Sequence, residues 1–180
     1  MIRITLGKAE LVLAIAWVIA RGIACLRRGR VDLRREAILL AVYLNLAVVL
    51  RFAFFPMHLS AGRVRPLMIR RSGLSSPRLN WVPFVNLFDY TRRRTLLTNV
   101  LGNMALFLPS GFALPLAYPR LNRLWKAILA GTAMSLCIEI LQLPVSSRVS
   151  DVDDLILNTV GFVLGYGLCA ALKRLHRAKK

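Results

Sequence analysis

Apolar residues follow one another in five long runs, and polar or basic residues separate each run from the next. The runs cover approximately residues 6–26, 36–55, 96–117, 124–143 and 155–172. Each approaches the roughly 20 residues that a helix needs to cross the apolar core of a bilayer. The pattern therefore predicts an all-α integral membrane protein with about five transmembrane helices.

The longest connection between these runs, residues 56–95, contains two dissimilar segments. Its first part, up to residue 79, is rich in Ser, Gly, Pro and Arg, which is typical of an irregular surface loop. Residues 80–90 (NWVPFVNLFDY) are aromatic and too short to span a membrane. We expect this second segment to lie at the membrane surface or to re-enter the membrane.

The third run contains residues that disturb helices. Pro109 lacks the N–H that a helix needs, so it predicts a kink or a break, and Gly111 and Pro115 should loosen the helix further. Pro144 marks the end of the fourth predicted helix.

The composition agrees with a membrane location. Of the 180 residues, 57% are hydrophobic and the mean hydropathy is +0.57, which is too apolar for an ordinary soluble domain. The length leaves no room for a separate soluble module, so we expect a single membrane domain over residues 1–180 with a basic tail at 173–180.

The formal charge of +18 comes from 26 Lys and Arg against 8 Asp and Glu. These cations cluster at the ends of apolar runs, where they meet membrane lipids and their anionic headgroups, and no nucleic-acid motif accompanies them. The short, dense basic loops and the tail are predicted to be cytoplasmic, which places the N-terminus outside and the C-terminus inside. The run Arg92–Arg94 opposes this assignment.

Polar residues recur on single faces of the last three predicted helices. On the fourth helix they follow an i, i+4, i+7 spacing, and a matching stripe begins the fifth, with an i, i+4 pair of amides on the third. Whichever way the chain is oriented, these groups lie in the same leaflet. They are Asn99, Asn103, Ser135, Glu139, Gln142, Asp154 and Asn158, with Arg148 and Asp151 in the connection.

This constellation has several possible roles. Asp151, at the start of the fifth helix, is suited to cap it, and the asparagines are suited to interhelical hydrogen bonds. Acids, amides and one arginine at a membrane surface also resemble a binding site for a polar headgroup, in which Glu139 or Asp154 is a candidate general base and Arg148 an anion clamp. No cofactor is predicted; Asp151, Asp153 and Asp154 are weak candidates for a divalent cation.

Four motifs occur in order along residues 36–172. They are Asn80-x-x-Pro83-Phe84; Asn99-x-x-x-Asn103-x-x-x-Phe107-x-Pro109-x-Gly111-Phe112; Ser135-x-x-x-Glu139-x-x-Gln142; and Arg148-x-x-Asp151-x-Asp153-Asp154-x-x-x-Asn158-x-x-Gly161-x-x-x-Gly165-Tyr166. Together they resemble the VanZ-like family. Ser110 departs from the apolar residue that is usual between the proline and the glycine.

The resemblance implies a small multi-pass protein of the bacterial cell membrane, whose namesake is associated with resistance to the glycopeptide teicoplanin. It implies no settled biochemical activity. Three functions therefore remain open at this point: a protein that engages a glycopeptide or lipopeptide antibiotic or a lipid-linked headgroup at the outer leaflet, a membrane hydrolase or transferase acting on such a lipid, and a non-enzymatic scaffold.

Overall fold

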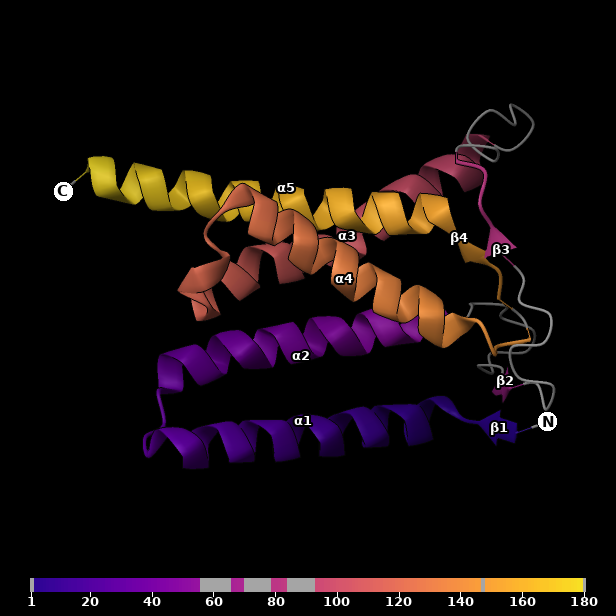
Figure 1. Ribbon diagram of the computed structural model, residues 1–180, viewed down its shortest axis with the longest axis horizontal. Coiled ribbons are helices and arrows are strands. Elements are labelled where there is room, and N and C mark those ends of the chain that lie inside the picture. Colours follow the sequence, from indigo (N-terminus) through magenta and orange to yellow (C-terminus); the bar gives the residue numbers. More distant parts are fainter. Residues whose placement is uncertain (1, 56–65, 70–78, 84–92, 147, 180) are drawn as a thin grey trace.

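A computed structural model describes residues 2–55, 66–69, 79–83, 93–146 and 148–179. The described chain consists of five long helices, with short strands gathered at one end of the bundle (Figure 1). The helices are α1 (Leu6–Arg28), α2 (Leu33–Phe54), α3 (Arg93–Ala117), α4 (Leu124–Gln142) and α5 (Val152–Ala178). All five are long and apolar enough to cross a membrane, which confirms the predicted fold class.

Three helices, α2, α3 and α5, begin three residues earlier than predicted, and an aspartate caps two of them. The Asp32 side chain accepts a hydrogen bond from the Arg35 N–H at the start of α2, and Asp151 accepts one from the Asp153 N–H at the start of α5. At its other end α5 continues to Ala178, so most of the predicted basic tail is helical.

Of the kink or break predicted at Pro109, the break is wrong, because Pro109 and Pro115 both lie inside a continuous helix. A neighbouring helix contacts the backbone near this proline. Asn45 of α2 donates a hydrogen bond of 2.9 Å to the carbonyl oxygen of Leu106, three residues before Pro109. Packing against adjacent helices is one way in which membrane helices accommodate proline.

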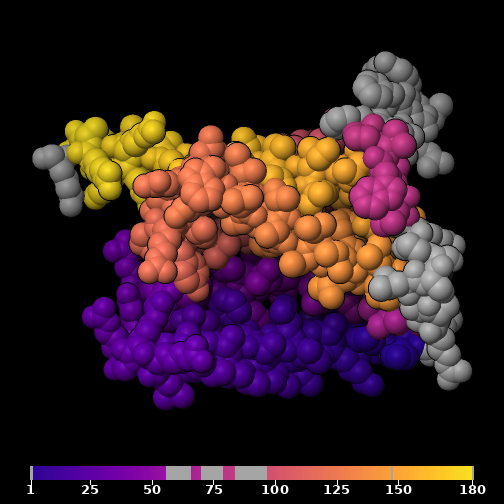
Figure 2. Space-filling view, in the orientation of Figure 1, coloured from indigo at the N-terminus to yellow at the C-terminus, as the bar shows by residue number. Residues whose placement is uncertain are grey.

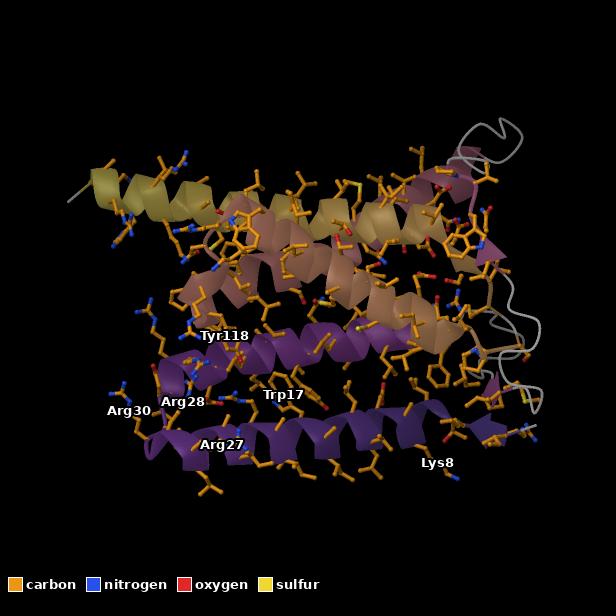
Figure 3. The ribbon with its side chains drawn as sticks, viewed as in Figure 1. Lys8, Trp17, Arg27, Arg28, Arg30 and Tyr118 are labelled. Atoms are coloured by element: carbon orange, nitrogen blue, oxygen red, sulfur yellow. The ribbon has the colours of Figure 1, made fainter. Side chains whose placement is uncertain are left out.

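Helix α5 packs against α3 and α4, and α2 packs against α3, whereas α1 lies at the edge of the bundle beside α2 (Figures 1 and 2). No residue of α1 is buried. An ion pair between Arg21 and Glu36 and a ring contact between Trp17 and Tyr43 join α1 to α2; Trp17 is labelled in Figure 3. The exposed apolar side chains of α1 are those that a lipid-facing helix presents.

Glycines of α5 lie directly against the backbone of α3. A Cβ atom added to Gly161 would overlap the backbone of Met104 in α3, and one added to Gly165 would overlap the backbone of Leu108. Small residues at this spacing let two helix backbones approach closely. The polar groups at the ends of α3 and α5 are thereby brought together.

Four short strands close one end of the bundle. β1 (Ile2–Ile4) pairs antiparallel with β2 (Leu67–Ile69), and β3 (Leu79–Asn80) pairs in parallel with β4 (Ser150–Asp151). Of the segment 80–90, only residues 80–83 are described, so its predicted surface or re-entrant position lies largely outside the described residues. The pairing of β3 with β4 nevertheless fixes the start of this segment beside the N-terminus of α5.

Candidate functional site

A pocket of about 780 Å³ opens at the strand-bearing end of the bundle, between α2, α3, α4 and the start of α5. Every residue that the sequence predicted to bind a substrate lines it. They are Asn99, Asn103, Glu139, Gln142, Arg148, Asp151, Asp154 and Asn158. The structure therefore brings the predicted residues into one cavity, at one depth of the bundle.

Glu139 ties α4 to the connection that precedes α5. Its side chain is 5% exposed, and its Oε2 atom accepts hydrogen bonds from the Ser150 hydroxyl (2.7 Å) and the Asp151 backbone N–H (3.1 Å). A buried carboxylate with two donors is well compensated for its lost hydration. Glu139 therefore fixes the position of α4 relative to the start of α5 at the pocket.

The two aspartates of the pocket have different partners. Asp151 caps α5 through a 3.0 Å bond from the Asp153 N–H, and its other oxygen accepts a 3.2 Å bond from the Asn80 amide of β3. Asp154, one turn along, accepts a hydrogen bond from the side-chain amide of Asn103. The Asp151 prediction of helix capping is confirmed, and Asp154 joins α5 to α3.

Gln142 and Arg148 both reach across to the last turn of α2. The Gln142 amide donates to the Ala53 carbonyl (2.7 Å), and the Arg148 guanidinium donates to the Phe52 carbonyl (2.5 Å). These carbonyls lie at a helix C-terminus, where they lack helical partners and favour positive charge. Burial lowers the pKa of the Arg148 guanidinium, while the carboxylates of Asp154 and Glu139 oppose this shift.

Two buried polar atoms of the pocket lining have no hydrogen-bond partner in the described part of the chain: Arg148 Nε and Asn158 Oδ1. The Asn158 amide nitrogen donates to the Ser135 hydroxyl at 3.0 Å, which is an interhelical hydrogen bond between α5 and α4 of the kind predicted for the asparagines. Its oxygen is left available as an acceptor, and Arg148 Nε as a donor. Buried groups of this kind normally find a partner, and here a ligand or a water molecule would supply one.

The sequence analysis missed the contribution of α2 to the pocket. Asn45 lines the cavity and accepts a hydrogen bond from Ser110, the residue that departs from the family pattern. The sequence did indicate a role for Asn45, because an amide inside an apolar membrane span is energetically unfavourable unless it has polar partners. Thr98 of α3 also lines the pocket.

The pocket offers no support for the cation site. Among the described residues, no group of three or more His, Cys, Asp or Glu side chains could hold a metal ion. Asp151, one of the candidate aspartates, is engaged in capping and in the contact with Asn80.

Glu139 and Asp154, the two candidate general bases, both line the pocket. Each carboxylate accepts hydrogen bonds from neighbouring protein groups through one of its oxygens, Oε2 of Glu139 and Oδ1 of Asp154. A general base needs its oxygen within hydrogen-bond reach of the proton that it removes. The role of these two carboxylates as bases stays a prediction.

Comparison with known proteins identifies one family. The sequence profile of the VanZ/LLP1 family matches residues 40–173, which is most of the chain and includes every residue of the pocket. No curated protein and no solved structure matches the chain. The predicted resemblance is thus confirmed, and this protein belongs to the VanZ/LLP1 family.

Proposed function

We propose that this protein binds the polar part of a lipid-linked molecule, or of a glycopeptide or lipopeptide antibiotic, at the outer surface of the bacterial cell membrane. The observation that carries the proposal is the pocket at one end of the bundle, which amides, carboxylates and one arginine line together with apolar side chains of α2, α3 and α4. Its volume of about 780 Å³ lies within the range of pockets that hold small molecules.

The side chains of the pocket favour a ligand rich in hydroxyl and amide groups. Amides such as Asn99, Asn103 and Asn158 both donate and accept hydrogen bonds, as sugar hydroxyls and peptide groups do. Three carboxylates face a single arginine, so a bare phosphate would meet more negative than positive charge. Sugars and peptides fit this lining better than a strongly anionic headgroup does.

The proposed orientation places this pocket outside the cell. The short basic connections between α1 and α2 and between α3 and α4 lie at the opposite end of the bundle, with the basic end of α5 (Figure 1). Under the positive-inside rule that end is cytoplasmic. A pocket at the other end is then accessible to envelope lipids and to antibiotics that arrive from outside.

The test compares Asn99→Ala and Asp154→Asn with Glu10→Gln. Glu10 is an exposed acid near the same end of the bundle and outside the pocket, so its variant is a matched control for loss of one carboxylate. In cells whose susceptibility to teicoplanin or a lipopeptide changes on expression of the wild-type protein, we expect both pocket variants to lose most of that change. The Glu10→Gln control should retain the wild-type change in susceptibility when its abundance in the membrane equals that of the other variants.

A wild-type effect that both pocket variants retain in full would contradict the proposal. Binding can be measured separately, by retention of lipid-linked precursors on the purified protein. There we expect the Asn99→Ala variant to bind about tenfold less, as loss of one or two hydrogen bonds predicts.

A second candidate function, a non-enzymatic scaffold, is favoured by the same hydrogen bonds. Glu139, Gln142 and Arg148 all bond to backbone groups of other elements, which would fix helix packing without any ligand. Asn99 separates the two candidates. It is exposed in the pocket and makes no hydrogen bond within the described part of the chain, so a scaffold would not require it.

A further inference from the structure

A second pocket, of about 700 Å³, lies at the opposite end of the bundle from the first. It is formed by the end of α1, the start of α2, the end of α3 with the turn that follows it, and α5. Its basic lining residues are Arg28, Arg34, Arg35, Arg120 and Lys173. None of the motifs discussed above includes these side chains, so the proposed function leaves the pocket unexplained.

The charge in this second pocket is strongly one-sided. Asp32 is its only acidic residue, and it is occupied as the cap of α2, where its side chain accepts the Arg35 N–H at 3.1 Å. None of the five cations forms an ion pair with a carboxylate in the described part of the chain. Five cations around one cavity repel each other, and an anion bound among them would relieve this repulsion.

Two of the cations are held in place by α3. Arg35 donates to the Ala117 carbonyl (3.1 Å), and its guanidinium lies 4.8 Å from the centre of the Tyr118 ring. Lys173 donates to the Pro115 carbonyl (3.1 Å) and the Asn122 side chain (2.9 Å). These contacts satisfy the end of α3 and also fix both cations at the pocket wall, so their positions are set before any ligand binds.

The other three cations, Arg28, Arg34 and Arg120, are exposed. No hydrogen bond fixes their side chains to another described residue. Figure 3 shows Arg28 on the same end of the molecule as Tyr118, with Arg27 and Arg30 close by on the same turn of chain. Free guanidinium groups around two fixed cations can close on the oxygens of a phosphate, which arginine binds in a bidentate manner.

The surroundings of the pocket indicate a lipid as the source of that phosphate. The pocket lies where five apolar helices end, and exposed apolar side chains begin two of them at this end, Leu33 in α2 and Leu124 and Trp125 in α4. Tryptophan at such a position is typical of the membrane interface. Ile38 and Leu116 line the pocket itself, so an acyl chain can lie against apolar side chains while its headgroup meets the cations.

We propose that this basic pocket binds the phosphate group of an anionic phospholipid, in the leaflet opposite to the one that the first pocket faces. The proposal does not depend on the function of the first pocket. It differs from general attraction between a basic surface and an anionic membrane, since it assigns the binding to particular arginines.

The test uses the full-length protein in lipid nanodiscs with the double variant Arg28→Gln/Arg120→Gln. The matched control is Arg27→Gln/Arg30→Gln, which removes the same charge from the same end but outside the pocket lining. We measure the phosphatidylglycerol retained by each purified protein, against phosphatidylcholine, by native mass spectrometry. The pocket variant should bind phosphatidylglycerol about tenfold more weakly than wild type, and the control less than about twofold.

Equal losses in the two variants, or no loss in either, would overturn the proposal. A further arm adds inorganic phosphate to the protein in phosphatidylcholine alone. If phosphate raises the melting temperature as much as phosphatidylglycerol does, the pocket takes a soluble phosphate and the lipid assignment is wrong. The melting temperatures of both variants in phosphatidylcholine should equal that of wild type, because the exchanged side chains are exposed.

Discussion

At the scale of single residues, Glu139 joins two elements of the fold, a structural role beyond its candidate role as a base. It lies on α4, yet both of its hydrogen bonds go to the connection that leads into α5. The same residue therefore shapes the pocket and joins two elements. Its substitution should affect stability as well as binding, and the two effects can be separated by the choice of replacement.

We expect Glu139→Ala to lower the free energy of unfolding by about 2–4 kcal/mol, because the Ser150 hydroxyl and the Asp151 N–H lose a charged acceptor. Glu139→Gln should cost less, since the amide oxygen still accepts. The measurement is unfolding in detergent by heat or denaturant, with Glu10→Ala as the exposed control. Wild-type stability in Glu139→Ala would show that these bonds contribute nothing.

The sequence could predict which side chains meet in the first pocket because their spacing places them on helix faces at one depth. It could not predict what each one bonds to. Gln142 and Arg148 donate to backbone carbonyls of α2. Every residue has such a carbonyl, so the residue types do not indicate which one accepts the bond. The pairing of Arg21 with Glu36 was likewise hidden, since it depends on how α1 lies against α2.

At the scale of elements, the crossing of α3 and α5 positions the site. Gly161 and Gly165 face the backbone of α3 rather than that of α4, and this contact brings Asn103 within reach of Asp154. The spacing of these glycines is visible in the sequence, but the helix that they contact is not. The sequence predicted a kink or a break at Pro109, and α3 is continuous there.

Replacement of Gly161 by alanine should lower the free energy of unfolding by about 1–3 kcal/mol, because the new Cβ would overlap the Met104 backbone. Gly167 of the same helix has open space at its Cβ position, so Gly167→Ala is the matched control. We expect Gly167→Ala to raise the free energy of unfolding by up to about 1 kcal/mol, because alanine has a higher helix propensity than glycine. Melting temperatures in detergent give both values; equal behaviour of the two variants would mean that the crossing is looser than described.

At the scale of the whole molecule, the bundle has two chemically different ends. One carries the amide and carboxylate pocket beneath short strands, and the other carries the basic pocket and the ends of α1, α3 and α5. Five spans place the N-terminus and the C-terminus on opposite sides of the membrane. Orientation therefore decides which of the two pockets an extracellular molecule can reach.

The basic end is expected in the cytoplasm, because its cations lie within a few residues of the helix ends, where they weigh most in membrane insertion. A green fluorescent protein fused after Lys180 should therefore fluoresce, and alkaline phosphatase fused there should be inactive, since the first matures inside the cell and the second outside it. The same reporters fused within the Gly29–Val31 turn should give the same pair of results, because that turn lies at the same end as the C-terminal part of α5. An active phosphatase at both positions would show that the orientation is the reverse of the predicted one. The amide and carboxylate pocket would then face the cytoplasm, and the proposal that it meets external antibiotics would fail, while the phospholipid proposal would stand in the outer leaflet.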